Sequence, residues 1–448
     1  MTETGHLHIP HEDQKHISTA VGKFFRRIIP MLAIMLIINQ IDRSNIGFIK
    51  AELQTDAGIS AAAFGLGAGL FFIGYALFEV PSNIMMKKYG ARLWLTRIMV
   101  TWGLVVVLTG FVTSPVQFYV LRFLLGVAEA GFFPGVLFYF RLWVPNSHRG
   151  RATAMILSAS AGAFLFSGPI TGSILMMHDM MGIAGWKWVM FLEGGGSVLV
   201  GLIALAVLVS RPQDARWLTA QEKQALINQL AREDRAREQH DAAPGKMALL
   251  TDRRLLTYCL IFFTMTMTGY TLVFWLPQII QRIQGFSSFG IGLLTAIPWL
   301  CAIIALNIVG RYSDRYRDKL NQGLGVAMLV AACGTFMATM GNPWFGFVAM
   351  IVACIGSKVS ATLFWPMPQG ELPASIVAPG IALINSIGNL GGFFAPTVFG
   401  YLELTTGSTT GGLYALTSVS VITGLWLLLL RHKPAPGAFV TVENKHVR

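Results

Sequence analysis

Two ionisable side chains, Arg122 and Glu129, lie inside the apolar segment VQFYVLRFLLGVAEAGFFPGVLFYF, residues 116–140. The segment is long enough to cross a bilayer as a helix. Seven residues make almost two helical turns, so the two side chains share a face but lie about 10 Å apart along the axis, too far for a close pair. An ion facing lipid costs roughly 2.5 kcal/mol or more, so each needs a partner on another helix or a water-filled cavity. Two interpretations stay open, a structural ion pair between helices and a substrate or proton path.

A second polar group interrupts the first apolar segment, residues 28–49. Its members are Asn39, Gln40, Asp42, Arg43, Ser44 and Asn45. A helix with so many polar groups cannot face lipid, which predicts that it lines an aqueous cavity. Asp42 and Arg43 point about 100° apart on a helix and therefore do not pair with each other. We expect Arg43 to face the cavity beside Arg122, where two guanidinium groups favour an anionic substrate and can hold a carboxylate through parallel hydrogen bonds.

Asp42 and Glu129 are the predicted proton carriers. Burial favours the neutral acid, whereas a nearby arginine favours the carboxylate. A substrate anion that draws an arginine away from the carboxylate makes it easier to protonate, which couples the binding of anion and proton. In the alternative interpretation the two acids only neutralise Arg43 and Arg122 across helices, and their mutation costs folding rather than proton dependence.

Further polar and aromatic side chains lie inside the apolar segments. Tyr75, Ser158, Ser160, Tyr270, Asn385 and Asn389 either hydrogen-bond the hydroxyl groups of a substrate or serve ordinary helix packing. Trp365 is either a cavity wall or an interfacial anchor. Lys358 either adds a third cation that selects a dianion, or snorkels or pairs with an acid. Glu79 and Glu193 stand near the ends of their segments, which favours structural roles between helices.

The elements that must position these residues are membrane-spanning helices. The chain has 448 residues, of which 54% are hydrophobic and 12% charged, and its mean hydropathy is +0.58. This composition indicates an all-α, polytopic membrane protein. Twelve apolar segments are predicted, at about 28–49, 62–85, 94–112, 116–140, 153–175, 188–210, 255–280, 288–310, 322–340, 344–367, 377–402 and 411–430.

The basic residues predict the orientation of the chain. Of its 34 Lys and Arg residues, 28 fall in the termini and in loops that the twelve segments place on one side, and three fall on the other. The positive-inside rule therefore places both termini and the central segment in the cytoplasm. We predict a disordered tail (1–22), a six-helix bundle (23–210), a central loop (211–254) whose residues 222–237 form a surface helix, a second six-helix bundle (255–432) and a tail (433–448).

Composition also excludes several classes of function. The net charge of +12 arises from these loop clusters rather than from a nucleic-acid-binding face, so no nucleic-acid partner is expected. The four cysteines lack metal-ligand spacing, and we expect no metal site. No nucleophile–base constellation or phosphate-binding loop is visible, which argues against an enzyme and leaves the proton as coupling ion, with no cofactor.

Several motifs resemble the major facilitator superfamily, over residues 24–432. They include GRYSDR (Gly310–Arg315) between two later segments and KKYGARLW (Lys87–Trp94) at the matching place in the first half. DRSNIGF (Asp42–Phe48), RFLLGVAEAGFFPG (Arg122–Gly135) and GWKWVMFLEG (Gly185–Gly194) further resemble its bacterial anion:cation symporters. The resemblance implies two pseudo-symmetric six-helix bundles, proton carriers at Asp42 and Glu129, substrate contacts at Tyr75 and Ser160, and gating loops with Lys87, Arg92, Asp314 and Arg315. Lys87 departs from the usual acidic residue, which puts the first gating contact in doubt.

These patterns together predict a monomeric symporter of the bacterial inner membrane. Its expected partners are the lipid bilayer, protons and a small organic anion, such as an aldonate, tartrate or another hydroxycarboxylic acid. Uptake of an aromatic acid and proton-coupled export of small molecules remain alternatives. The segment GPITG (Gly168–Gly172) resembles a motif of drug:proton exporters, whereas Arg43 and Arg122 favour an anion.

Overall fold

The computed structural model describes residues 11–238, 252–313, 319–340, 342–372 and 374–429, and within these ranges it contains helices and no strands. The chain divides into two compact units. The first comprises Met1–Asp241 and Gly285–Ala296, and the second comprises Ala242–Gln284 and Ile297–Arg448. The predicted fold class, an all-α membrane protein, is confirmed.

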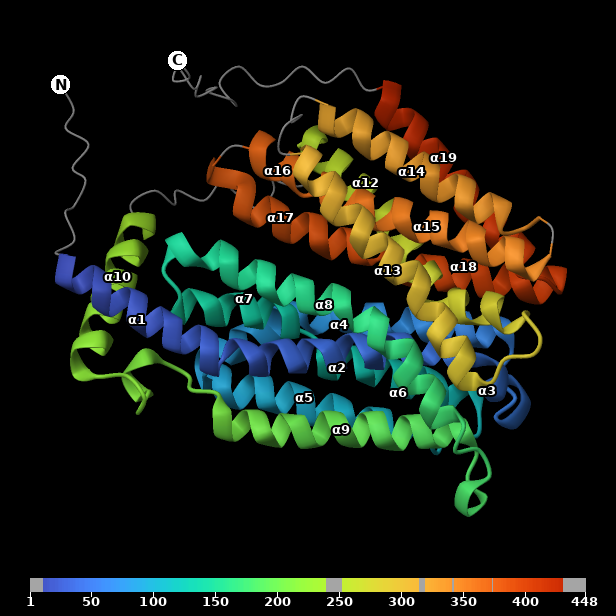
Figure 1. The fold of residues 1–448 in the computed structure, drawn as a ribbon, viewed down its shortest axis with the longest axis horizontal. Coiled ribbons are helices and arrows are strands. Elements are labelled where there is room, and N and C mark those ends of the chain that lie inside the picture. Colours follow the sequence, from blue (N-terminus) through green and yellow to red (C-terminus); the bar gives the residue numbers. More distant parts are fainter. Residues whose placement is uncertain (1–10, 239–251, 314–318, 341, 373, 430–448) are drawn as a thin grey trace. The chain divides into compact units, whose positions relative to one another are not determined.

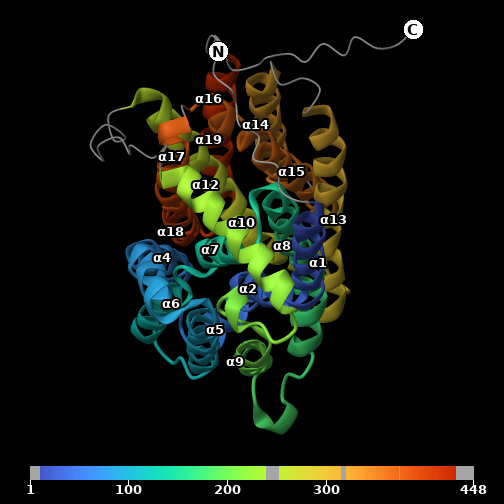
Figure 2. The ribbon, with the colours of Figure 1, turned by 90° about the vertical axis from the view of Figure 1, so that its left-hand side faces the viewer.

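The helices of the first unit are α1 (His11–Arg27), α2 (Ile29–Phe48), α3 (Lys50–Asp56), α4 (Ala61–Tyr89), α5 (Ala91–Thr109), α6 (Pro115–Glu129), α7 (Phe132–Trp143), α8 (Asn146–Leu175), η1 (Met180–Gly182), α9 (Gly185–Val207), η2 (Pro212–Asp214) and α10 (Ala220–Glu238) (Figure 1). Within this unit α2 packs against α8 and α9, α4 packs against α6, and α5 packs against α9 (Figure 2).

The helices of the second unit are α12 (Arg253–Gln281), α14 (Leu320–Met337), α15 (Pro343–Phe364), α16 (Pro366–Glu371), α17 (Ala374–Asn389), α18 (Gly391–Thr406) and α19 (Thr410–Leu429). α13 (Ser288–Ser313) begins in the first unit and continues in the second. In the second unit α14 packs against α15 and α19, and α12 packs against α15, α17 and α18.

Eleven helical segments among the described residues are long and apolar enough to cross a membrane. α2 is not one of these, because its polar residues lower its hydropathy, but its 20 residues match the thickness of a bilayer. With α2 counted as the first span, the described helices supply the twelve predicted spans. Short local signals start several of them: the Ser60 and Ser114 side chains accept hydrogen bonds from the backbone N–H of Ala63 and Gln117, which caps α4 and α6.

The predicted disordered tail is wrong for residues 11–22, which lie in α1, while residues 1–10 lie outside the described part of the chain. α1 buries Ile17, Val21 and Phe24 on one face, with Phe24 stacked on Trp143 of α7. Lys23 pairs with Glu222 of α10 at 2.8 Å. The short apolar face is hidden among polar residues in the sequence, so composition alone points to a tail.

The predicted surface helix of the central segment is confirmed as α10. Its first turn is closed by a reciprocal pair of hydrogen bonds, from Glu222 N–H to the Thr219 hydroxyl and from Thr219 N–H to the Glu222 carboxylate. Glu222 also accepts from Lys23. Burial alone raises the pKa of Glu222, but the hydrogen bonds from Lys23 and from the Thr219 backbone outweigh it and hold the pKa below the usual value.

The segment at 116–140 is not one continuous helix, which corrects the prediction. α6 ends at Glu129 and α7 begins at Phe132, because Gly131 adopts the left-handed conformation at φ 82°. A Cβ at Gly131 would lie 2.6 Å from the Ser82 hydroxyl oxygen. The predicted span 377–402 is likewise divided, into α17 and α18, and Trp365 separates α15 from α16. The breaks place Glu129, Trp365 and Asn389 at helix ends.

Candidate functional site: a buried arginine pair in the first unit

Four consecutive polar residues of α2 contact four neighbouring helices between them. Asp42 turns towards α5 and α9, Arg43 towards α6, Ser44 towards α8, and Asn45 towards α9. Because successive residues of a helix point about 100° apart, a run of four reaches neighbours on all sides. All four are buried except Arg43, whose side chain is 20% exposed. α2 therefore carries a buried polar segment that is hydrogen-bonded to the helices around it in the first unit.

Arg43 and Glu129 form an ion pair. The Arg43 Nε and Nη2 groups both donate to Oε1 of Glu129, whose residue is only 1% exposed. Glu129 is the last residue of α6, directly before the Gly131 break. The Arg43 guanidinium carbon also lies 5.2 Å from the ring centroids of Phe71 and Tyr75, on α4. Arg43 is thus held by one carboxylate and two aromatic rings.

Arg122 is buried beside the same aromatic ring. Its residue is 3% exposed, and its guanidinium carbon lies 5.2 Å from the centroid of Phe71, the ring that Arg43 also contacts. The Arg122 Nε is buried without a hydrogen-bond acceptor among the described residues. Since a buried cation is costly unless it is paired, this nitrogen is available to an added anion.

Close helix packing sets this geometry. A Cβ on Gly126 of α6 would lie 2.0 Å from the backbone oxygen of Phe71, and one on Gly74 of α4 would lie 2.4 Å from that of Phe123. The two backbones can approach only because both residues lack side chains. Arg122, one turn before Gly126, is thereby brought against Phe71. Nothing in the sequence distinguishes Phe71 from the other apolar residues of its helix, so sequence reasoning did not predict it as part of the site.

Asp42 and Glu129, the two predicted proton carriers, have different partners. Asp42 Oδ2 accepts hydrogen bonds from Trp102 Nε1 of α5 at 2.8 Å and from Ser197 Oγ of α9 at 2.5 Å. Its second oxygen, Oδ1, is buried without a hydrogen-bond partner among the described residues. The alternative in which both acids neutralise the two arginines fits Glu129, which holds Arg43, but not Asp42.

Glu193 lies close to Asp42 in the packing of α2 against α9. Asn45 Nδ2 donates to its Oε2, and Thr171 Oγ of α8 donates to its Oε1, each at 2.7 Å. The sequence placed Glu193 in a structural role only. It gave no indication that Thr171 contacts Glu193 or that Trp102 and Ser197 contact Asp42. The position of Glu193 inside an apolar segment could have indicated a functional role, because acids are rare there.

Of the other predicted residues of the first unit, one contacts the arginine pair, and two make no hydrogen bond among the described residues. The ring of Tyr75 contacts Arg43. Ser158 is exposed and Ser160 is partly buried on α8, and neither makes a hydrogen bond within the part of the chain that the structure describes. Their assignment to the substrate remains a prediction.

The predicted residues of the second unit are partly buried. Tyr270 stacks with Phe274, and Trp365 packs against Phe262 and Phe364. The Lys358 Nζ lies 5.2 Å from the ring centroid of Trp299, a cation–π contact that the sequence did not predict. Asn385 and Asn389 lie on α17, the latter at its end. These roles also remain predictions.

Of the predicted gating residues, Lys87 and Arg92 are described, whereas Asp314 and Arg315 lie outside the described residues. Lys87 is exposed, and its Nζ lies 5.9 Å from the ring of Phe138. Arg92 Nε donates to the Leu205 carbonyl oxygen at 2.7 Å, and its backbone N–H donates to Ser210 Oγ. Arg92 therefore ties the start of α5 to the end of α9.

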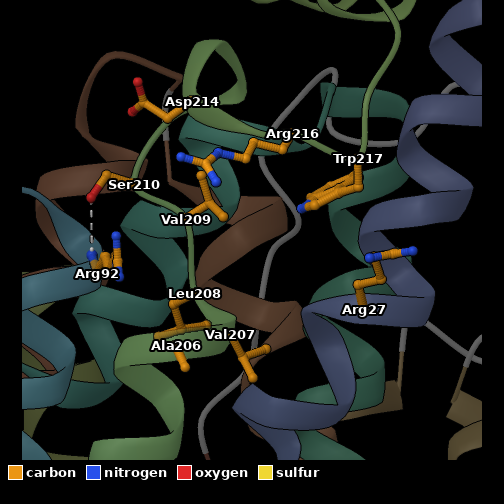
Figure 3. Close-up of a pocket in the computed structure, with 10 residues that line it drawn as sticks. All are labelled: Arg27, Arg92, Ala206, Val207, Leu208, Val209, Ser210, Asp214, Arg216 and Trp217. Carbon is orange, nitrogen blue, oxygen red and sulfur yellow. Dashed lines mark hydrogen bonds between the residues drawn. The ribbon is translucent and has the colours of Figure 1, made fainter.

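A cavity of about 700 Å³ lies at this end of the first unit. Figure 3 shows Arg92 and Ser210 on one side of it and Trp217 and Arg27 on the other, with Arg216 extending between them. None of Asp42, Arg43, Arg122 and Glu129 lines this cavity. The buried arginine pair is thus separate from this cavity.

Comparisons with known proteins agree on the family. A family model described as Major Facilitator Superfamily matches residues 32–396. A protein named "Putative tartrate transporter" from Agrobacterium vitis is 39% identical over 420 residues, which cover 94% of this chain and 93% of the relative. A "Quinolone resistance transporter" from Acinetobacter baumannii is 40% identical over 402 residues, which cover 90% and 92%. The crystal structure of a D-xylose-proton symporter is similar in fold, with a TM-score of 0.73 and 14% identity over 93% of this chain and 99% of the solved one.

Proposed function

The chain belongs to the major facilitator superfamily, and on this premise we propose that it takes up a small organic anion together with protons. The protein is a multi-pass membrane transporter and not an enzyme. We place it in the inner membrane of a bacterium, with both termini in the cytoplasm and with two six-helix bundles that expose the site alternately to each side.

The observation that carries this proposal is the pair of guanidinium groups against Phe71. The buried Nε–H of Arg122 donates to no acceptor among the described residues, and Arg43 lies against the same ring. A planar guanidinium binds a carboxylate through two parallel hydrogen bonds, so an acid substrate supplies what Arg122 lacks. A cationic or neutral substrate gains nothing from this pair.

Proton coupling follows from competition for Arg43. While Glu129 holds Arg43, the carboxylate is neutralised by the cation. If a substrate anion takes Arg43, Glu129 is left buried beside a second negative charge, and uptake of a proton relieves both costs. Inward movement of an anion also opposes the inside-negative membrane potential by about 2.3 kcal/mol per charge per 100 mV, which co-transported protons offset.

We propose a hydroxycarboxylic or sugar acid, such as tartrate or an aldonate, as substrate. Two of its features match the cluster: a carboxylate for Arg122 and hydroxyl groups for nearby polar side chains such as Tyr75. The Agrobacterium relative named for tartrate supports this class. An aromatic acid that stacks on Phe71 or Tyr75 is the alternative within the same mechanism.

The test is uptake of labelled tartrate, aldonates and aromatic acids into proteoliposomes, with and without an inward-directed proton gradient. Wild-type protein should accumulate one class of anion faster when the gradient is applied. Glu129→Gln should retain anion exchange and lose the stimulation, because the amide cannot carry the proton. Glu233→Gln, at an exposed end of the same unit, is the matched control and should behave like wild type. Gradient-independent movement in folded wild type overturns symport.

Proton-coupled export is the second candidate, and the Acinetobacter relative named for quinolone resistance favours it. Inside-out vesicles discriminate the two directions. An exporter accumulates its substrate in them when their interior is acid, whereas the proposed symporter loses preloaded anion from their lumen under the same gradient.

A further inference from the structure

A second buried acid, Glu193, lies one turn before Ser197 in α9 and on the side of α2 away from the arginine pair. Its residue is 8% exposed, and its two oxygens accept hydrogen bonds from the neutral groups Asn45 Nδ2 and Thr171 Oγ. No cation pairs with it among the described residues. Asp42 has the same kind of surroundings, since its partners Trp102 and Ser197 are also neutral.

Ser197 contacts the carboxyl group of Asp42 and the backbone of Glu193. Its Oγ lies 2.5 Å from Asp42 Oδ2 and 3.1 Å from the backbone oxygen of Glu193. A hydroxyl has one proton to donate. Both contacts are hydrogen bonds at once if Ser197 donates to the Glu193 carbonyl and Asp42 donates its own proton to Ser197. The geometry therefore accommodates a proton on Asp42 Oδ2, which lies within hydrogen-bond distance of Ser197.

The cost of a buried charge also favours the protonated form of both acids. An ionised carboxyl without a cation is very costly inside a protein within a membrane, whereas a neutral acid needs only ordinary hydrogen bonds. A protonated Glu193 satisfies its partners, because its carbonyl oxygen can accept from Asn45 while its O–H donates to the Thr171 hydroxyl oxygen. Two ionised carboxylates would also repel each other, and the charge of Glu193 reaches Asp42.

The other charged groups on helices packed against α2 and α9 are engaged elsewhere. Arg43 is paired with Glu129, which is the remaining acid whose charge reaches Asp42. Other cations on these helices lie against other groups, namely Lys23 at Glu222, Arg27 over Trp217, Lys50 against Phe64, Arg92 at Leu205, Arg97 over Trp94, Arg149 at Glu233, Arg151 over Phe25 and Lys187 over Trp186.

We infer that Glu193 is a second membrane-embedded proton-binding residue, and that Asp42 and Glu193 both hold protons while Arg43 is paired with Glu129. In the context of the proposed symport, Arg43 directly follows Asp42 in α2, so a movement of α2 that carries Arg43 to a substrate also shifts Asp42 and Asn45 along α9. The two acids then lose their hydrogen bonds together and release or take up protons in the same step.

Infrared absorption of the protonated carboxyl C=O group tests this inference on the purified full-length protein, without any substrate. At neutral pH the wild type should show absorption from buried protonated carboxyls. Asp42→Asn and Glu193→Gln should each remove roughly one carboxyl's share of it, whereas Glu129→Gln should leave it unchanged, because Glu129 is ionised against Arg43. Thr171→Val should shift the band of Glu193 without removing it, since it deletes one hydrogen bond to that acid.

Thermal unfolding supplies a second measurement. Gln in place of a protonated Glu193 has the same shape and the same donor and acceptor, so the Tm of Glu193→Gln should match wild type. If Glu193 is an ionised structural anchor, the variant leaves the infrared band unchanged and lowers the Tm, and the inference is overturned. Neither measurement requires transport, so failure of the proposed symport leaves this result interpretable.

Discussion

Under the proposed function, anion recognition depends most directly on Arg122. It is buried against Phe71, and its Nε lacks an acceptor among the described residues. Glu129, by contrast, is committed to Arg43 in this structure. The spacing of the two arginines did not predict that Arg43 is paired with a carboxylate while the Nε of Arg122 has no acceptor among the described residues.

Arg122→Lys should weaken anion binding while the protein remains folded. Lysine keeps the charge but loses the planar pair of donors, and loss of a charge-assisted hydrogen bond costs about 1.5–3 kcal/mol, or roughly 10-fold to 100-fold in Kd. The measurement is binding of the transported anion to purified protein. Arg97→Lys is a matched control, because Arg97 is also an arginine inside a span with an unpartnered Nε, but it stacks on Trp94 away from the cluster. Equal effects of both variants would contradict the assignment.

At the scale of single helices, the break between α6 and α7 positions Glu129. Gly131→Ala should lower the Tm by a few degrees, because the new Cβ meets Ser82 and a left-handed conformation costs about 1–2 kcal/mol outside glycine. Gly162→Ala, on α8 with open space around it, should leave the Tm unchanged or raise it slightly. Thermal unfolding in detergent compares the two; similar Tm values would mean that Gly131 does not set the break.

The contact between α1 and α10 predicts a pH-dependent local stability. The pKa of Glu222 is lowered in the folded protein, so its pairing with Lys23 stabilises the α1–α10 contact above the ordinary glutamate pKa of about 4.3 and is lost as the pH falls below it. At neutral pH, Glu222→Gln should speed amide hydrogen exchange in α1 on the order of twofold to fivefold, as expected for a partly exposed pair.

Glu233→Gln on the same helix is the control for that experiment, because Glu233 contacts Asn146 and Arg149 rather than α1. It should leave exchange in α1 at the wild-type rate. The difference between Glu222→Gln and wild type should shrink in buffer more acidic than the ordinary glutamate pKa of about 4.3, where Glu222 itself takes up a proton. A difference that persists there would show that the pair acts through packing rather than charge.

For the whole molecule, the charge asymmetry predicts which ends of the first unit face the cytoplasm. In a variant without native cysteines, Ser147→Cys in the exposed first turn of α8 should react with an impermeant thiol reagent from the cytoplasmic side only. Asp179→Cys, in the exposed connection between α8 and α9, should react only from the opposite side. Labelling of both from one side would refute the twelve-span orientation.

Much of the fold was predictable from the sequence because a bilayer imposes a length and a polarity on every span. The apolar segments, the central helix α10 and the family resemblance were all confirmed. The helix α1 was missed because Ile17, Val21 and Phe24 form too narrow an apolar face to stand out among charged neighbours. The Gly131 break was missed because a glycine in an apolar segment is compatible with a continuous helix.

The sequence by itself determined which ionisable groups lie inside the membrane and need a partner, a proton or water there. The cost of a buried charge applies whatever the packing. It also determined that Asp42 and Arg43 diverge, because helical geometry fixes the angle between neighbours. Only the tertiary structure decided that Arg43 meets Glu129, that Arg122 meets Phe71, and that Asp42 shares Ser197 with α9. Helical periodicity predicts the direction of a side chain on its own helix, but its partner depends on which helices pack together. Small residues such as Gly74 and Gly126 allow α4 and α6 to pack with their backbones in close contact.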